Sequence, residues 1–234
     1  MRIGGFQKLS LIEYPGKISC VVFTIGCNLR CPYCYVPQLV LPEKMKGLRE
    51  IPESEIFSFL EKNKGLNDAV VITGGEPTLQ PDLRDFIRGI KEMDYLVAIE
   101  TNGTNFEVLK LLIEEGLVDY VEMDIKNRLD FERYNLTVGN VLTEEMFENI
   151  KKSIELLLED IVPYEFRTTL VREFHGIDDV VEIAKAIKGA RAYYLQNLKM
   201  GVETIGKERF TPVDGETLEE MIKRVSKFVR VIGR

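Results

Sequence analysis

Apolar residues follow two alternating spacings along this chain of 234 residues. Short runs rich in Val, Ile, Phe and Tyr are typical of buried strands, and longer segments with helical period separate them. We expect strands at Ile18–Ile25, Ala69–Thr73, Leu96–Glu100, Tyr120–Ile125, Glu165–Val171 and Ala192–Leu195.

The segments between these strands place apolar residues three and four positions apart, which is the spacing of a helix with one buried face. Pro52 stands at the start of the first such segment, and Gly65 and Gly189 follow the first and the fifth. We expect helices from about Pro52 to Lys64, around Leu83 to Met93, from Phe106 toward Gly116, around Met146 to Leu158, from Ile177 to Lys188, and near Glu216 to Arg230.

Strands that alternate with helices predict an α/β fold with a parallel sheet and right-handed crossovers. Six strands are two short of a closed eight-stranded barrel, so an open sheet and a partial barrel both fit the pattern. In either case, ligands bind in the loops that follow the C-terminal ends of the strands. The chain has no repeat, low-complexity tract or linker, so we expect residues 1–234 to form a single domain.

The net charge of −7 argues against a protein that binds nucleic acid or an anionic membrane, because both favour a basic face. No run approaches the ~18 apolar residues of a membrane span, and the N-terminus lacks the apolar core of a signal peptide. We therefore expect a cytoplasmic protein whose thiols stay reduced. All four cysteines lie between Cys20 and Cys34, and such bunching indicates a metal site rather than disulfides.

Three of the cysteines, Cys27, Cys31 and Cys34, follow the first strand with the spacing C-x3-C-x2-C. Thiolates are iron–sulfur ligands, and three of them around a cube of four irons leave one iron open to bind a cofactor or substrate. A structural zinc site needs four ligands, and the single histidine, His175, lies far away in the sequence. Cys20 stands among valines on the strand itself, so we expect it to be a small core residue.

The cysteine loop resembles the signature of the radical S-adenosylmethionine (SAM) superfamily, C-x3-C-x-aromatic-C, with Tyr33 as the aromatic residue. The resemblance implies a partial (β/α)6 barrel with parallel strands, open at one side, and a 4Fe–4S cluster on Cys27, Cys31 and Cys34. It also implies that the open iron binds the amino and carboxylate groups of SAM. One electron then cleaves SAM to methionine and a 5′-deoxyadenosyl radical, which abstracts a hydrogen atom.

The second strand ends in Thr73-Gly74-Gly75-Glu76-Pro77. The two glycines let the backbone come close to a ligand, and Glu76 offers an acceptor for an ammonium group. Alone, this pattern could be a turn before the next helix. Beside the cysteine loop it resembles the superfamily's GGEP motif, which implies that it holds the amino group of SAM.

Polar residues also follow the third and fourth strands. Thr101-Asn102-Gly103 is ordinary turn chemistry, and it resembles the D-T-N-G motif of glycyl-radical activases near SAM, with Glu100 in place of Asp. Asp124 and Lys126 share one face of the fourth strand, so they form either part of a ligand site or a surface ion pair. The superfamily has a similar D-L-K motif there, which implies contacts with the ribose and methionine parts of SAM.

On the fifth strand, Arg167 and Thr169 share a face and are further candidates to line the SAM pocket. Gln196, at the end of the sixth strand, is a weaker candidate. His175 could donate a proton, but a lone histidine in a loop is usually solvated.

The segment from Phe6 to Lys17, which leads into the cluster strand, resembles the start of the longer activating proteins for anaerobic ribonucleoside-triphosphate reductase. One departure is Tyr35-Val36-Pro37, where that family usually has His-Asn-Pro. The resemblance implies a glycyl-radical enzyme as the partner, with the reductase as its first candidate, and a flavodoxin- or ferredoxin-type electron donor. The radical would be stored on a glycine of the reductase.

Three alternatives stand beside this interpretation. The client could be another glycyl-radical enzyme, of the pyruvate formate-lyase type. The substrate could be a small molecule, as in 7-carboxy-7-deazaguanine synthesis. The chain could also be a non-catalytic iron–sulfur or zinc protein, which metal and sulfide analysis would identify.

Overall fold

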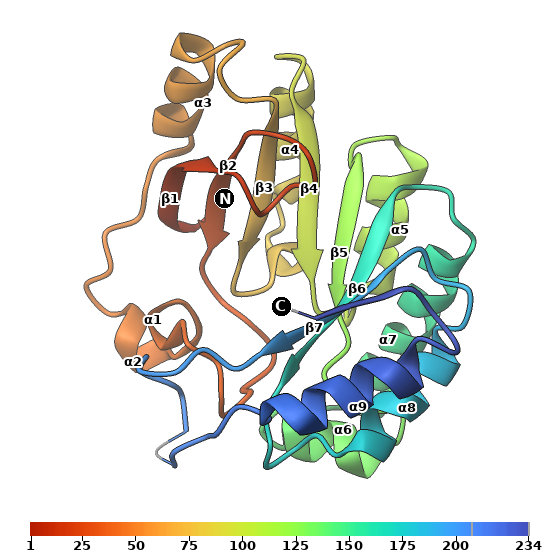
Figure 1. Cartoon of the computed structure of the whole chain (residues 1–234). Coiled ribbons are helices and arrows are strands. Elements are labelled where there is room, and N and C mark those ends of the chain that lie inside the picture. Colours follow the sequence, from red (N-terminus) through yellow and green to blue (C-terminus); the bar gives the residue numbers. More distant parts are fainter. Residues whose placement is uncertain (207, 234) are drawn as a thin grey trace.

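The computed structural model describes residues 1–206 and 208–233, and within them eight strands form one sheet in sequence order (Figure 1). Strands β2 to β8 run parallel, and β1 runs antiparallel to β2. The strands are β1 (Ile3–Ser10), β2 (Ser19–Thr24), β3 (Ala69–Gly74), β4 (Leu96–Thr101), β5 (Tyr120–Asp124), β6 (Tyr164–Leu170), β7 (Tyr193–Asn197) and β8 (Val231–Gly233). The sheet is open, with β1 and β8 at its edges, as in a partial barrel.

Helices connect the parallel strands. They are α1 (Pro37–Val40), α2 (Pro42–Met45), α3 (Glu53–Lys62), α4 (Leu83–Lys91), α5 (Phe106–Glu114), α6 (Phe131–Thr137), α7 (Glu144–Leu158), α8 (Ile177–Ala186) and α9 (Gly215–Val225), with a 3-10 turn at Pro77–Leu79. The longest, α7, has 15 residues. Among the described residues, no helix has both the length and the apolar character to cross a membrane.

The six predicted strands are confirmed as β2 to β7, and the six predicted helices as α3, α4, α5, α7, α8 and α9. Strand β1 was missed because Ile3-Gly-Gly-Phe-Gln-Lys-Leu-Ser has no clear apolar alternation, and only part of it is buried. Strand β8 has three residues, too few to show a period. The parallel part of the sheet therefore has seven strands instead of six.

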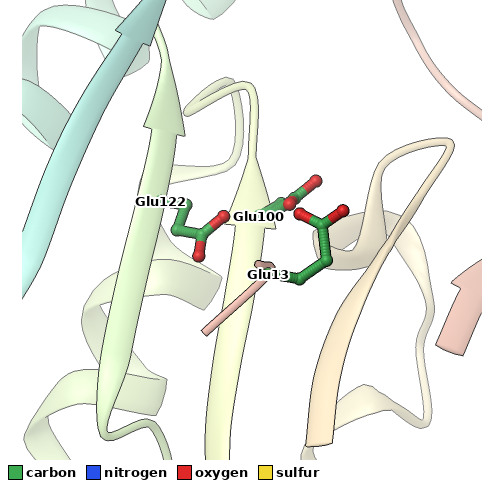
Figure 2. Close-up of side chains that lie close together, drawn as sticks. All are labelled: Glu13, Glu100 and Glu122. Carbon is green, nitrogen blue, oxygen red and sulfur yellow. The ribbon is translucent and has the colours of Figure 1, made fainter. Parts of the chain in front are cut away.

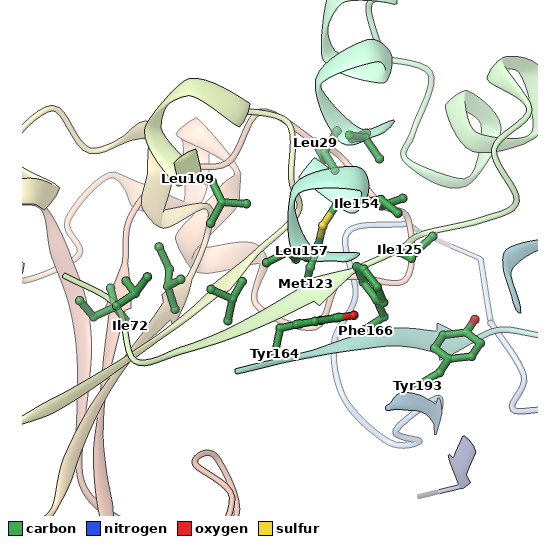
Figure 3. Close-up of a cluster of buried hydrophobic side chains, with 14 of the residues drawn as sticks. Leu29, Ile72, Leu109, Met123, Ile125, Ile154, Leu157, Tyr164, Phe166 and Tyr193 are labelled. Atoms are coloured by element: carbon green, nitrogen blue, oxygen red, sulfur yellow. The ribbon is translucent and has the colours of Figure 1, made fainter. Parts of the chain in front are cut away.

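One face of the sheet packs against the helices. Met123 on β5 and Phe166 on β6 lie in the same buried cluster as Leu109 of α5 and Ile154 and Leu157 of α7 (Figure 3). All five are at most 2% exposed. Because burial of such a side chain contributes about 1.5–3 kcal/mol, this face supplies most of the driving force for folding. Cys20 is fully buried in the same cluster, which confirms its prediction as a core residue.

The opposite, concave face is covered near the N-terminal ends of the strands by the loop between β1 and β2. Figure 1 shows this loop, in red, crossing in front of β3 and β4. Tyr14 from the loop is buried against Val71 and Ala98, and its ring lies 5.5 Å from that of Tyr120. Only the part of the concave face near the C-terminal ends of the strands is left for a ligand.

Candidate active site

All thirteen residues predicted for the site line one cavity of about 350 Å³ at the C-terminal ends of the parallel strands. These residues lie at the C-terminal ends of β3, β4 and β5, in the loops that follow β2 to β5, and in the second half of β6. They are Cys27, Cys31, Tyr33, Cys34, Gly74, Gly75, Glu76, Thr101, Asn102, Asp124, Lys126, Arg167 and Thr169. Gln196, the weaker candidate, lines the same cavity.

The three cysteines share one short loop that presents its sulfur atoms to this cavity. The amide of Cys34 donates to the carbonyl of Cys31 at 2.9 Å, which closes a tight turn. Cys27 Sγ receives the amide of Leu29 at 3.4 Å and the side-chain amide of Asn102 at 3.9 Å. Such N–H donors stabilise negative charge on a metal-bound sulfur.

Burial raises the pKa of Cys27 to about 12 and that of Cys31 to about 11, and it also raises the pKa of Cys34. Lys126 acts in the opposite direction on all three thiols. A metal must therefore displace protons when it binds, because the ligand is the thiolate. Three sulfur donors from one loop suit a cluster with one open iron and do not complete a four-ligand zinc site.

The two glycines of the GGEP motif let its loop pack directly on the cysteine loop. Gly74 has a φ of +110°, and a Cβ there would collide with the backbone of Thr24. A Cβ on Gly75 would collide with the carbonyl of Gly26, which also accepts the amide of Glu76 at 2.7 Å. The sequence suggested close approach to a ligand, and in the structure the closest approach is to the residue before Cys27.

Glu76 ties the loop after β3 to the loop after β4. Its carboxylate is 1% exposed and accepts four hydrogen bonds. Thr78 donates twice and the Thr101 hydroxyl once to Oε1, whereas the amide of Asn102 donates to Oε2 at 2.7 Å. A carboxylate has about four acceptor positions divided between its two oxygens, so Oε2 retains room for an ammonium group.

Asn102 connects this pair of loops to the cysteine loop. Its Nδ2 donates to Asn28 Oδ1 at 3.0 Å, and its Oδ1 accepts the Thr104 hydroxyl at 2.6 Å. The Asn28 amide in turn donates to the Thr104 hydroxyl at 2.8 Å. The side chains of Thr101 and Asn102 thus order the loops around Cys27. Asn28 and Thr104 were not singled out from the sequence, because Asn28 occupies an unspecified position of the cysteine motif and Thr104 lies outside the motifs.

Asp124 and Lys126 form an ion pair of 2.6 Å in the cavity wall. Burial alone would lower the pKa of Lys126. The Asp124 carboxylate, the Tyr33 hydroxyl and the Cys31 thiol together outweigh burial, so the pKa of Lys126 is raised. The lysine therefore stays charged beside the cysteine loop. The pair lines the cavity and does not lie on the outer surface, which is the arrangement that a role in ligand binding requires.

Next to this pair, toward the N-terminal ends of the strands, three glutamates form a row across the concave face. Glu100 on β4 pairs in register with Glu122 on β5, and Glu122 pairs with Glu165 on β6. Arg167 contacts all three carboxylates, at 3.0 Å to Glu100 and 2.6 Å to Glu165, and also contacts Glu122. Burial and the charge of Glu100 raise the pKa of Glu122, and the charge of Arg167 acts in the opposite direction.

Glu13, from the loop between β1 and β2, completes this acidic group. Figure 2 shows its carboxylate turned toward those of Glu100 and Glu122, and oxygens of the three lie within 4.8 Å of one another. The sequence hinted only at Glu100, as the residue in place of Asp. Glu122 and Glu165 could have been noticed as charged residues on otherwise apolar strands. That they form a row with Glu100 is visible only once the register of the three strands is known.

His175 was expected to be solvated, and this expectation is wrong. The side chain is 2% exposed and contacts the backbone of Val171 and Lys126. Burial lowers its pKa. The histidine belongs to the support of the cavity wall, and it is not among the residues that line the cavity.

Known proteins with three different names illustrate what this chain is similar to in sequence. A protein of Methanocaldococcus jannaschii named "putative glycyl-radical enzyme activating enzyme" is 37% identical over 97% of this chain and 92% of its own length. The pyruvate formate-lyase-activating enzyme of Clostridium pasteurianum is 31% identical over 66% of this chain and 63% of its own. A "probable GTP 3′,8-cyclase" of Pyrococcus horikoshii is 30% identical over 58% of this chain and 42% of its own.

The solved structure of SuiB from Streptococcus suis bound to S-adenosylmethionine superposes with a TM-score of 0.69. It is 14% identical and covers 92% of this chain, which spans about half (51%) of that protein, so the likeness shows a common fold. Residues 21–187 of this chain match the radical SAM superfamily. Together with the cysteine loop, this match identifies an enzyme of radical chemistry whose cofactors are a 4Fe–4S cluster and SAM. The chain belongs to the radical SAM superfamily.

Proposed function

We propose that this enzyme is a glycyl-radical activase, and that its client is an anaerobic ribonucleoside-triphosphate reductase. The observation that carries the activase assignment is the similarity to the Methanocaldococcus jannaschii protein over nearly the full length of both chains. The reductase as client rests on the resemblance of the segment from Phe6 to Lys17. We propose further that residues 1–234 act as one radical SAM domain in the cytoplasm, where thiols stay reduced.

The cluster, when bound, supplies the electron that splits SAM into methionine and a 5′-deoxyadenosyl radical. The residues of this chain bind and orient the reactants. Cys27, Cys31 and Cys34 would hold three irons of the cluster, and Glu76 would accept a hydrogen bond from the amino group of SAM. The Asp124–Lys126 pair presents one acceptor and one cation from the cavity wall.

A glycine-containing loop of a protein client suits the cavity rim. Ile12 and Tyr35 line the cavity and are 70% and 54% exposed, so two large side chains with apolar surface are accessible to a client at the cavity. The GTP 3′,8-cyclases match this chain over 42–64% of their own length, whereas the Methanocaldococcus jannaschii protein matches it over 92%, which favours the activase over a small-molecule cyclase. The electron donor in this proposal is a flavodoxin- or ferredoxin-type protein.

The test measures 5′-deoxyadenosine release from the anaerobically reconstituted and reduced enzyme, with and without the reductase of the same host. Parallel samples are frozen for the electron paramagnetic resonance signal of a glycyl radical. The proposal expects release and a glycyl doublet that requires the reductase. Release with no doublet would remove the reductase as the client, and a doublet on a formate-lyase-type enzyme would replace it. The Cys31→Ala variant is the control for both signals.

A further inference from the structure

The single histidine of the chain is built into the wall behind the cavity. His175 follows β6, and two backbone groups from different loops contact its ring. The amide of Val171 donates to Nδ1 at 3.0 Å, and Nε2 lies 2.8 Å from the carbonyl oxygen of Lys126. The ring therefore connects the loop after β6 to the loop after β5.

These two contacts determine which ring nitrogen carries the proton. A backbone N–H can only donate, so Nδ1 must offer its lone pair to Val171. A carbonyl can only accept, so Nε2 must carry the hydrogen that bonds to Lys126. In the other tautomer, Nδ1–H could turn only to the carbonyl of Val171 at 3.2 Å, and both the Val171 amide and the Lys126 carbonyl would lose their partner on the ring.

A second buried side chain also contacts the backbone of Lys126. The hydroxyl of Tyr134, which is fully buried on α6, accepts the amide of Lys126 at 3.0 Å. Both polar backbone groups of Lys126 are thus bonded to buried rings from other parts of the fold. A residue that has both its N–H and its carbonyl bonded in this way has little freedom to move its Cα.

The same loop after β6 also supports the cysteines. The ring of Phe174, next to His175, lies 5.9 Å from the ring of Tyr33. Arg133 and Asp179 form an ion pair near the imidazole, and Arg133 also donates to the carbonyl of Phe174 at 2.9 Å. The loop that carries His175 is therefore anchored on its outer side and touches the cysteine loop on its inner side.

We propose that His175 is a positioning residue for SAM chemistry, whose neutral Nε2–H form holds the Lys126 carbonyl so that the lysine ammonium stays beside Asp124 in the cavity. The inference rests on the proposed use of the cavity for SAM. It does not depend on which client receives the radical.

The first test reads the tautomer directly. Because His175 is the only histidine, two-dimensional nitrogen–proton spectra of the selectively labelled full chain contain one imidazole. We expect a protonated Nε2 and a bare Nδ1, together with slow exchange of the Nε2 proton. A proton on Nδ1 would overturn the proposal whatever the activity of the loaded enzyme.

The second test separates the two contacts of the imidazole ring, Nδ1 with the Val171 amide and Nε2 with the Lys126 carbonyl. The side-chain amide of His175→Gln reaches the position of Nε2 and can donate to the Lys126 carbonyl, whereas the shorter side chain of His175→Asn reaches only the position of Nδ1. In the 5′-deoxyadenosine assay without any client, we expect kcat/KM for SAM to fall about tenfold or more in His175→Asn and no more than about threefold in His175→Gln. Equal losses in the two variants, in step with equal losses of melting temperature, would overturn the proposal.

Tyr134→Phe removes only the hydroxyl that accepts the Lys126 amide, and so tests the second backbone contact of Lys126. We expect kcat/KM for SAM to fall in this variant as well, by about threefold or more. An unchanged value would contradict the positioning of Lys126 by its backbone contacts. Because none of these measurements uses a client protein, a failure to form a glycyl radical on the reductase leaves them interpretable.

Discussion

Replacing Arg167 with Met should destabilise the fold strongly, because it removes the cation that contacts Glu100, Glu122 and Glu165. The side chains of Glu122 and Glu165 are fully buried, and that of Arg167 is 7% exposed. The three glutamates face one another in register, so without the guanidinium their mutual repulsion would be unscreened. Methionine keeps the volume of the alkyl stem, which confines the perturbation to charge and hydrogen bonding.

Breaking a buried ion pair by removing one partner costs about 3–5 kcal/mol, so we expect a loss of about 4 kcal/mol at pH 8. For a chain of this length, that corresponds to a melting temperature lower by about 8–16 °C. The loss should be smaller at pH 5.5. Arg167 is the group that lowers the pKa of Glu122 against burial and Glu100, so in the variant that pKa rises further. A raised pKa in the folded state means that stability present at low pH is lost as the pH increases.

Urea unfolding followed by circular dichroism at pH 5.5, 7 and 8.5 measures these differences. The matched control is Arg2→Met, which breaks an ion pair with Glu50 whose side chains are 56% and 45% exposed. Its unfolding midpoint should be nearly unchanged, since exposed pairs contribute little. A loss below about 1 kcal/mol for Arg167→Met, or a loss that is the same at all three pH values, would refute the reasoning about the buried row.

Three further changes test other parts of the site. Glu122→Gln should remove the fall in stability at alkaline pH that the raised pKa of Glu122 causes, which urea unfolding at pH 6 and 9 measures; equal slopes for the two proteins would contradict it. Cys31→Ala should abolish iron binding and SAM cleavage, whereas Cys20→Ala should keep both and lose about 1–2 kcal/mol of stability; iron retained by Cys31→Ala would remove this cysteine as a ligand. Gly75→Ala should lower the iron content through a collision with the Gly26 carbonyl, and Gly215→Ala, where a Cβ meets nothing, is its control; equal iron in both would count against the packing argument.

The fold and the motif residues could be predicted because each leaves a local signal. Strands such as β3 and helices such as α7 have apolar periods long enough to read along the chain. The cysteine spacing and the glycine pair lie within a few residues of one another, and parallel strands gather their C-terminal loops at one edge. Strand β1 leaves no such signal, because its role depends on pairing with β2 and on the loop that follows it.

The contacts that organise the site join residues far apart in sequence, and no local pattern contains them. Glu76 bonds Thr101 and Asn102 across 25 and 26 residues, and His175 reaches Lys126 across 49. The same holds for the row of glutamates, since a one-residue shift of β5 would turn Glu122 from the concave face to the helices. The motifs therefore identify groups that line the cavity, whereas the register of the sheet decides which charged side chains lie next to them. An activity that depends on Lys126 should therefore also respond to changes at His175, which no motif contains.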